Sequence, residues 1–164
     1  MAKHLTLIRH AKSSWDDSGL QDFERPLNGR GLKNAPMMGR RLAAAGYTFD
    51  TIISSPAVRA ITTAKLIAAE IGFDENSILQ IHSLYAAGLG TLVDVVREID
   101  NRFQDAILVG HNPGFTQLCR YLSQTRILNM PTCCIARIEF DAQSWETAAI
   151  QKGHLANFDY PRKA

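Results

Sequence analysis

Arginine and histidine side chains follow three short apolar stretches of this chain. Arg9 and His10 come directly after "LTLI", His111 follows "ILVG", and Arg59 lies shortly after "IISSP". A guanidinium stays protonated at physiological pH, and its planar N–H donors match the oxygens of a phosphate group. A neutral imidazole can attack phosphorus and carry the phosphoryl group covalently. If the fold brings them together, these four side chains predict phosphoryl transfer.

In this chemistry His10 is the nucleophile. Its ring is expected to be neutral, with one nitrogen held by a backbone carbonyl so that the lone pair of the other faces phosphorus. Arg9, Arg59 and His111 are expected to stabilise charge on the phosphoryl oxygens in the transition state. The sequence contains neither a Gly-rich Walker loop nor an Asp/Glu cluster typical of a metal site, so we expect no metal and no other cofactor. The remaining histidines are interpreted as surface or packing residues: His4, His82 and His154.

The elements that must position these residues alternate between strands and helices. Apolar runs predict strands at 5–8, 51–54, 78–81 and 106–110. Helical periodicity predicts helices at 28–46, 55–72, 92–99 and 112–122. This alternation is typical of an α/β fold, here a three-layer α/β/α sandwich around a mainly parallel sheet. Because the carboxyl ends of parallel strands share one edge of such a sheet, the arginines and histidines are expected to meet there.

The polar stretch between the first strand and the first helix is predicted to be a loop, and that helix then has clear boundaries. Asn28 is the expected N-cap, and Gly46 is the expected end. Pro36 falls inside the pattern and is expected to kink the helix or delay its start. The side chains predicted to face inward are Leu32, Ala35, Leu42 and Ala43.

Two further helices begin with a polar residue followed by proline. Ser55 and Asn112 are the expected N-caps, each with a proline at the first helical position, and Gly72 ends the earlier helix. A late pair of strands is expected at 134–140 and 146–151.

Length and composition restrict the possible classes of protein. With 164 residues and 46% hydrophobic content, the chain is predicted to form a single domain over 1–164. A net charge of +2 without a basic aromatic-rich block gives no reason to expect nucleic acid. Apolar runs fall far short of the roughly 20 residues of a membrane span, so no membrane association is expected. The sequence makes no prediction of oligomeric state.

The three cysteines favour a reducing compartment. Cys119, Cys133 and Cys134 are odd in number, and two of them are adjacent, which suits neither a disulfide framework nor a zinc site. The N-terminal "MAKHLTLIRH" has charge on both sides of its short apolar run, unlike a signal peptide. We therefore expect reduced thiols and a cytoplasmic protein.

Several of these motifs resemble those of a known family. "LIRHAKSSW", "ISSPAVRAITTA" and "VGHNPG" are similar, in this order, to the signatures of the histidine phosphatase superfamily, also called phosphoglycerate mutase-like. The short chain and "RPLNGRG" at 25–31 resemble its SixA-type branch of phosphohistidine phosphatases. The resemblance implies a phosphoglycerate mutase-like α/β/α fold, His10 as the residue that becomes phosphorylated, and a phosphate pocket completed by Arg9, Arg59 and His111.

The chain departs from the family pattern at two positions. Ala11 replaces the usual glycine after Arg-His, which is a small change. Larger members carry a glutamate that protonates the leaving group, whereas "SLYAAG" places Ala86 at that point. An imidazole leaves phosphorus more easily than an alkoxide once it is protonated, so the loss of this acid favours phosphohistidine over a sugar phosphate.

A substitute acid is expected in the loop before the first helix. Asp22 is the first candidate for this general acid, and the alternatives are Asp16, Asp17 and Glu24. Arg25 and Asn112 are candidates for binding the phosphate or the substrate, and Lys12 for steering an acidic partner. Since few residues between 72 and 106 remain to build a lid, we expect an open, shallow site.

The predicted function is a metal-free phosphatase acting through phospho-His10, with a protein phosphohistidine as the expected substrate. One alternative is a phosphomonoesterase or mutase acting on a small phosphate ester. Another, of a different class, is a non-catalytic module that binds phosphate and regulates a partner. The presence of both histidines and both arginines favours an enzyme, because a binding module needs no nucleophile.

Overall fold

The computed structural model describes residues 2–163, and its centre is a six-stranded sheet with the strand order β3-β2-β4-β1-β5-β6. The strands are β1 (Lys3–Arg9), β2 (Thr51–Ser54), β3 (Leu79–Gln80), β4 (Asp105–Gly110), β5 (Ile135–Phe140) and β6 (His154–Asp159). β1, β2, β3 and β4 pair in parallel, and β5 pairs antiparallel with both β1 and β6. The sheet is therefore mixed and mainly parallel, as predicted.

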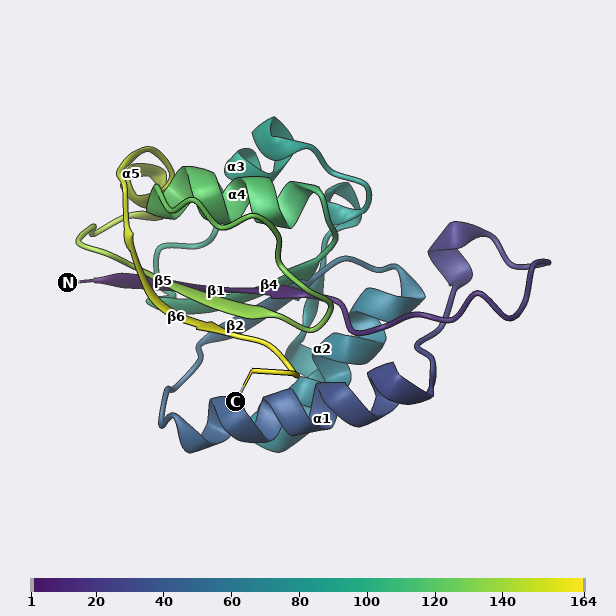
Figure 1. The fold of residues 1–164 in the computed structure, drawn as a ribbon. Helices are drawn as coiled ribbons and strands as arrows, with labels where there is room; N and C mark the ends of the chain where they lie inside the picture. The colour runs from purple at the N-terminus through teal and green to yellow at the C-terminus, as the bar shows by residue number, and fades with distance from the viewer. Residues whose placement is uncertain (1, 164) are drawn as a thin grey trace.

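Helices cover both faces of this sheet (Figure 1). The α-helices are α1 (Gly29–Ala44), α2 (Val58–Ile71), α3 (Leu89–Arg97), α4 (Gly114–Ser123) and α5 (Trp145–Ile150). Three short 3-10 helices join them: η1 (Asp22–Glu24), η2 (Glu75–Ser77) and η3 (His82–Leu84). α1 and α2 pack on one face, and α3, α4 and α5 on the other. This arrangement confirms the three-layer α/β/α sandwich.

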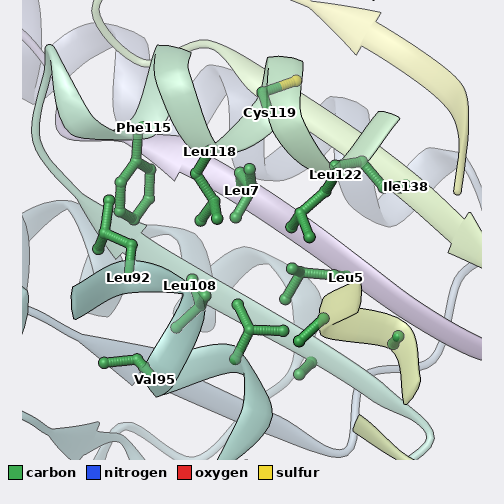
Figure 2. Close-up of a cluster of buried hydrophobic side chains, with 14 of the residues drawn as sticks. Leu5, Leu7, Leu92, Val95, Leu108, Phe115, Leu118, Cys119, Leu122 and Ile138 are labelled. Atoms are coloured by element: carbon green, nitrogen blue, oxygen red, sulfur yellow. The ribbon is translucent and has the colours of Figure 1, made fainter. Parts of the chain in front are cut away.

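The central strands are apolar because both of their faces are buried. On the face of α3 and α4, Leu5 and Leu7 of β1 lie in one cluster with Leu108, Phe115 and the other side chains of Figure 2. On the opposite face, Ile8 belongs to a second cluster with residues of α1 and α2. This double burial fixes β1 and β4 in the middle of the sheet, and with them the residues at their carboxyl ends.

The first helix agrees with the predicted N-cap but not with the predicted inner face. The side chain of Asn28 accepts a hydrogen bond from the backbone N–H of Gly31, which is the capping geometry. The prediction for two of the four inward residues is wrong: Leu32 is 52% exposed, and Ala43 is exposed as well. Ala35 and Leu42 are buried as predicted, and Met38 is buried with them. Pro36 lies inside the helix without delaying its start.

The N-caps of α2 and α4 also differ from the predicted Ser55 and Asn112. α2 begins at Val58 with Ala57 as its N-cap, because the backbone carbonyl of Ala57 accepts the first helical hydrogen bonds. Ser55 therefore lies outside the helix, and its hydroxyl makes other contacts. In α4 the N-cap is Pro113, although the side chain of Asn112 accepts from the backbone N–H of Thr116 in the first turn. Gly72 ends α2 in the left-handed conformation with φ of 74°, as expected.

The predicted strand at 146–151 is wrong, since this segment forms α5. The side chain of Ser144 caps the helix by accepting from the backbone N–H of Thr147, and Trp145, Ala148 and Ala149 are buried at helical spacing. The partner of β5 is β6 instead, which forms the edge of the sheet.

Candidate active site

Three strand ends deliver the predicted side chains to one edge of the sheet. Arg9 ends β1, and His10 follows it; His111 follows β4; Arg59 lies in the first turn of α2, after β2. The ring centroids of His10 and His111 are 5.2 Å apart. Both imidazoles are 8% exposed, and Arg59 is 7% exposed. The structure thus brings the two histidines together in a largely buried site.

Backbone hydrogen bonds fix the position of His10. Its N–H donates to the carbonyl of Gly110 at the end of β4, at 2.9 Å. The N–H of Cys133 donates to the carbonyls of both Arg9 and His10, at 3.0 and 3.1 Å. Cys133 adopts a φ of 60°, which is rare outside glycine. The nucleophile candidate is therefore held on both sides by neighbouring chain segments.

The ring of His10 has the orientation that a nucleophile needs. Its Nδ1 lies 2.7 Å from the backbone oxygen of Ala11, so Nδ1 carries the proton and donates it to this carbonyl. Burial, opposed in part by this hydrogen bond, lowers the pKa of His10 to about 3. The imidazole is therefore neutral at physiological pH, and the lone pair of Nε2 is available.

His111 is held by a hydroxyl and an aromatic edge. Its Nε2 lies 2.8 Å from Oγ of Ser55, and its ring packs edge-on against Tyr85 with the centroids 5.6 Å apart. Burial and the charge of Arg59 lower the pKa of His111 to about 4, so this ring is also neutral at pH 7. Nδ1 of His111 is buried without a hydrogen-bond partner in residues 2–163. His111 can therefore offer Nδ1–H to an oxygen of a bound phosphate.

Arg9 retains unused donors beside the nucleophile. Its Nη1 donates to the backbone carbonyl of Met130 at 2.9 Å, whereas its Nε is buried and has no partner among the described residues. Burial lowers the pKa of Arg9, but a guanidinium still carries its charge at neutral pH. This fixed cation with a free donor suits an anionic group.

Arg59 makes two hydrogen bonds to a single residue of the first loop. Its Nη1 donates to the backbone carbonyl of Asp22 at 2.6 Å, and its Nη2 donates to Oδ2 of Asp22 at 2.9 Å. A guanidinium has five N–H donors, so three remain. The backbone oxygen of Arg59 accepts from Thr63, whose hydroxyl in turn accepts from the N–H of Ala11. This chain of hydrogen bonds connects Arg59 to the residue that orients His10.

The carboxyl group of Asp22 is surrounded by donors. In addition to Arg59, Tyr85 donates its hydroxyl hydrogen to Oδ2 at 2.7 Å, and Arg25 donates to Oδ1 at 3.1 Å. The hydrogen bond from Tyr85, with those from Arg59 and Arg25, holds the pKa of Asp22 well below its ordinary value. Asp22 is therefore an ionised carboxylate at neutral pH, and this arrangement does not support its predicted role as a general acid.

Arg25 and Asn112 are engaged in structural contacts. The three nitrogens of Arg25 donate to Ser14 O, Ser13 Oγ and Asp22 Oδ1, and its guanidinium stacks on Trp15, 3.2 Å from the ring centroid. Both donors of the Asn112 amide are used, on the side chain of Asn129 and the carbonyl of Met130. Asn112 therefore has no free donor for a phosphate, whereas the guanidinium of Arg25 keeps two of its five N–H donors.

The other acid candidates are exposed. Asp17 accepts a hydrogen bond from the N–H of Gly19 in its own loop, and Asp16 and Glu24 are exposed. Lys12 is exposed as well. Ala86, which stands where larger relatives carry an acid, adopts a φ of 54°. No second acid thus replaces Asp22 in these contacts.

Sequence reasoning missed two kinds of residue in this site. Ser55 is predicted to cap a helix but contacts His111, and no pattern in the sequence points to Tyr85. His82 is exposed, as predicted, and it also lies with Phe23 and Tyr85 in an aromatic group beside Asp22, with the ring centroids of Phe23 and Tyr85 5.0 Å apart. The short helix η1 brings Asp22 to Arg59 and Phe23 to Tyr85 at this edge of the sheet.

A search of residues 2–163 finds no group of three or more His, Cys, Asp or Glu side chains that could hold a metal ion. No helix in the same range is long and apolar enough to cross a membrane. All three cysteines are free and buried.

Comparisons with known proteins agree with the fold. A model of the histidine phosphatase superfamily (branch 1) matches residues 5–84. A chloroplastic protein of Arabidopsis thaliana is 32% identical over 161 residues, covering 93% of this chain and 73% of that protein. The crystal structure of the SixA protein of Agrobacterium tumefaciens, described as a phosphohistidine phosphatase, has a TM-score of 0.82 and 27% identity and covers 97% of this chain and 98% of its own. The protein histidine phosphatase SixA in complex with tungstate has a TM-score of 0.82 at 19% identity, over 96% of this chain and 97% of its own.

The chain belongs to the histidine phosphatase superfamily and has its phosphoglycerate mutase-like fold. Within this superfamily it matches the SixA-type phosphohistidine phosphatases along nearly the whole chain. By family and fold, it is a phosphatase.

Proposed function

We propose that this protein hydrolyses phosphohistidine on a partner protein through a covalent phospho-His10 intermediate and without a metal ion. The observation that carries the proposal is the state of His10. Its Nδ1 is bonded to the carbonyl of Ala11, and its neutral ring lies 5.2 Å from that of His111. Few purely structural roles need a buried, neutral imidazole packed against a second one.

In the first step, the lone pair of His10 Nε2 attacks phosphorus, and the bond between phosphorus and the substrate nitrogen breaks with its electron pair going to that nitrogen. Arg9, Arg59 and Nδ1–H of His111 donate to the phosphoryl oxygens, where charge is distributed in the transition state. The proton stays on Nδ1 of His10, where it is hydrogen-bonded to the carbonyl of Ala11, so the phosphorylated ring carries a positive charge.

In the second step, water attacks the phosphorus of phospho-His10. The N–P bond breaks with its electron pair returning to Nε2, and the protons of the water remain with the phosphate. Because the ring was cationic through its Nδ1–H, it leaves as a neutral imidazole. The orientation of His10 by Ala11 therefore allows dephosphorylation without an acid at this nitrogen.

The absence of an acid among the contacts of the site favours phosphohistidine as the substrate. Asp22 is an ionised carboxylate paired with Arg59, and Ala86 stands where larger relatives carry a glutamate. An alkyl ester needs a proton on its leaving oxygen, whereas the second ring nitrogen of phosphohistidine can already be protonated before the reaction. The likeness to SixA proteins described as phosphohistidine phosphatases supports the same substrate class.

A phosphorylated protein is thus the proposed partner, and the cytoplasm is the proposed location. The two alternatives, a phosphatase or mutase for a small phosphate ester and a regulatory module that only binds phosphate, predict different results in one experiment. The protein is incubated with a histidine-containing peptide that has been phosphorylated with radiolabelled phosphoramidate, and the reaction is quenched in base. We expect label on the protein that is stable in base, labile in acid and absent from His10→Ala.

Release of phosphate from the phosphohistidine peptide at a higher kcat/KM than from a panel of sugar phosphates would support the proposed substrate. The opposite order would support the small-ester enzyme. A protein that binds phosphate but forms no label and shows no turnover would be the regulatory module, and the proposal would then be wrong.

A further inference from the structure

A carboxylate and a group of aromatic rings lie at the entrance of the site. We call this group the entrance rim; it consists of Asp22, Phe23, His82 and Tyr85. The ring of Phe23 packs edge-on against Tyr85, at 5.0 Å between centroids, and its centroid is 5.9 Å from that of His82. The hydroxyl of Tyr85 donates to the carboxylate of Asp22. Aromatic rings and an anion are thus combined in one small surface.

The entrance rim lies closer to solvent than the nucleophile His10. The side chain of Asp22 is 50% exposed, whereas His10 is 8% exposed. Tyr85 links the rim to the buried site, because its ring packs on His111 and its hydroxyl donates to Asp22. In an in-line displacement, the leaving group departs on the side of phosphorus opposite the attacking nitrogen. Because the side chain of Asp22 is more exposed than His10, a leaving group that departs toward solvent passes the rim.

The carboxylate is held in place at this position. Asp22 is fixed by Arg59 through both its backbone oxygen and Oδ2, and by Arg25 through Oδ1. Arg25 is itself fixed by Ser13 and Ser14. An ionised carboxylate offers about four acceptor positions. Arg25, Arg59 and Tyr85 occupy three of them in Asp22, so the half-exposed group can accept one more hydrogen bond, from a substrate.

We propose that Asp22, flanked by Phe23 and Tyr85, forms a leaving-group subsite that recognises the flat cationic ring of protonated phosphohistidine and discriminates against phosphate esters. This inference rests on the proposed function and adds the residue that selects the leaving group. Asp22 then acts as a hydrogen-bond acceptor, in contrast to the proton donor expected from sequence.

The chemistry of the two substrate classes differs at this subsite. In phosphohistidine, the ring nitrogen that bears no phosphorus binds a proton, and the ring becomes a cation. Asp22 accepts a hydrogen bond from this N–H, and the aromatic faces attract the ring charge. When the P–N bond breaks, its electron pair goes to the nitrogen that carried phosphorus, and a neutral imidazole leaves. An ester instead develops negative charge on its leaving oxygen, which the carboxylate repels.

The variant Asp22→Asn tests this role because it removes the charge and keeps the shape. The backbone oxygen of residue 22 still accepts from Nη1 of Arg59, and the amide oxygen can accept from Nη2. Asp17→Asn is the matched control. It removes the same charge from the same loop, and the amide can still accept from Gly19, away from the site.

The kinetics are measured with two substrates, a phosphohistidine peptide and p-nitrophenyl phosphate. We expect Asp22→Asn to lower the ratio of the two kcat/KM values at least about tenfold, as the loss of a hydrogen bond to a charged group does. In Asp17→Asn the ratio is expected to stay within about threefold of the wild-type value.

An equal fall for both substrates, or a ratio within about threefold of wild type in Asp22→Asn, would mean that Asp22 only positions Arg59, and the inference would be wrong. These results are distinguishable from failure of the proposed function. If the wild-type protein forms no label on His10, both proposals fail; if it forms the label and only the ratio is unchanged, the role of Asp22 alone is overturned.

Discussion

Nε2 of His111 lies 2.8 Å from Oγ of Ser55, and the two residues come from the ends of neighbouring parallel strands. Ser55 is fully buried, and its hydroxyl also accepts from the backbone N–H of Ala57. This leaves the hydrogen of the hydroxyl free to be donated to the ring of His111. Nε2 is then the acceptor and Nδ1 carries the proton, which is the tautomer needed to donate to a phosphate oxygen.

We predict that Ser55→Ala lowers kcat/KM about tenfold. The variant leaves Nε2 of His111 buried without its hydrogen-bond partner, and the proton of this ring is then no longer held on Nδ1. Steady-state kinetics with a phosphohistidine peptide measure this effect. Ser54→Ala is the matched control: Ser54 is equally buried and adjacent, but its hydroxyl donates to the backbone carbonyl of Ser55. If both variants lose the same activity, the hydroxyl of Ser55 has no specific role toward His111.

Arg59→Ala is predicted to lower kcat/KM at least about 100-fold, because in the proposed mechanism this buried cation donates to the oxygens on which charge develops. The same variant is expected to lose the anchor of Asp22, so the thermal midpoint is measured in parallel. Arg40→Ala serves as the control, since Arg40 is largely exposed and pairs with Glu70 on the surface. A change in kcat/KM of less than about threefold in Arg59→Ala would place this arginine outside the chemistry.

The placement of the four central side chains was predictable, because it depends on strand order more than on side-chain packing. Apolar runs identify β1 and β4 as central strands, and a residue that follows a central parallel strand must lie at the carboxyl edge of the sheet. Even the hydrogen bond from His10 to a backbone carbonyl follows from what a nucleophilic imidazole requires.

The entrance of the site was not predictable in the same way. The contact between Asp22 and Arg59 joins a polar loop without periodicity to a helix 37 positions away, and no pattern in either segment encodes it. The same holds for Met130, whose backbone carbonyl binds Arg9 and Asn112 regardless of its side chain. The helix α5 was not predictable because a six-residue segment with Thr and Ile fits a short strand equally well until the capping role of Ser144 is known.

The burial of His10 predicts a pH dependence of stability. The unfolded imidazole has a pKa near 6.5, and burial lowers the folded value to about 3. Between these values the unfolded chain binds a proton that the folded protein does not, so the free energy of unfolding decreases as the pH falls from about 7 toward 3. We expect thermal midpoints measured at pH 7, 6 and 5 to fall less steeply in His10→Asn than in wild type.

His154→Asn is the control for this measurement, because His154 is exposed on β6. Its midpoints are expected to follow those of the wild type. Parallel curves for His10→Asn and wild type would show that His10 gains its proton as easily in the folded state as in the unfolded one, and the neutral nucleophile would then have no support.

The close approach of α1 to the segment after His10 gives a last prediction. A Cβ atom on Gly31 would overlap the backbone carbonyl oxygen of Lys12, whereas a Cβ on Gly29 would meet nothing within 4 Å. The carbonyl of Lys12 cannot move freely, because it accepts the N–H of Asn28 at 3.0 Å. Gly31→Ala therefore forces apart the backbone of the first loop and the start of the helix, at a cost of about 1–3 kcal/mol.

Gly29→Ala lies in the same helical turn and is expected to be neutral or slightly stabilising, because alanine favours a helix over glycine. Urea unfolding of the two variants separates the effects. Since Lys12 follows directly on the residue that orients His10, Gly31→Ala is also expected to reduce kcat/KM, and Gly29→Ala is not. Equal stabilities of the two variants would mean that the loop yields without cost, and that its backbone contributes nothing to holding His10 in place.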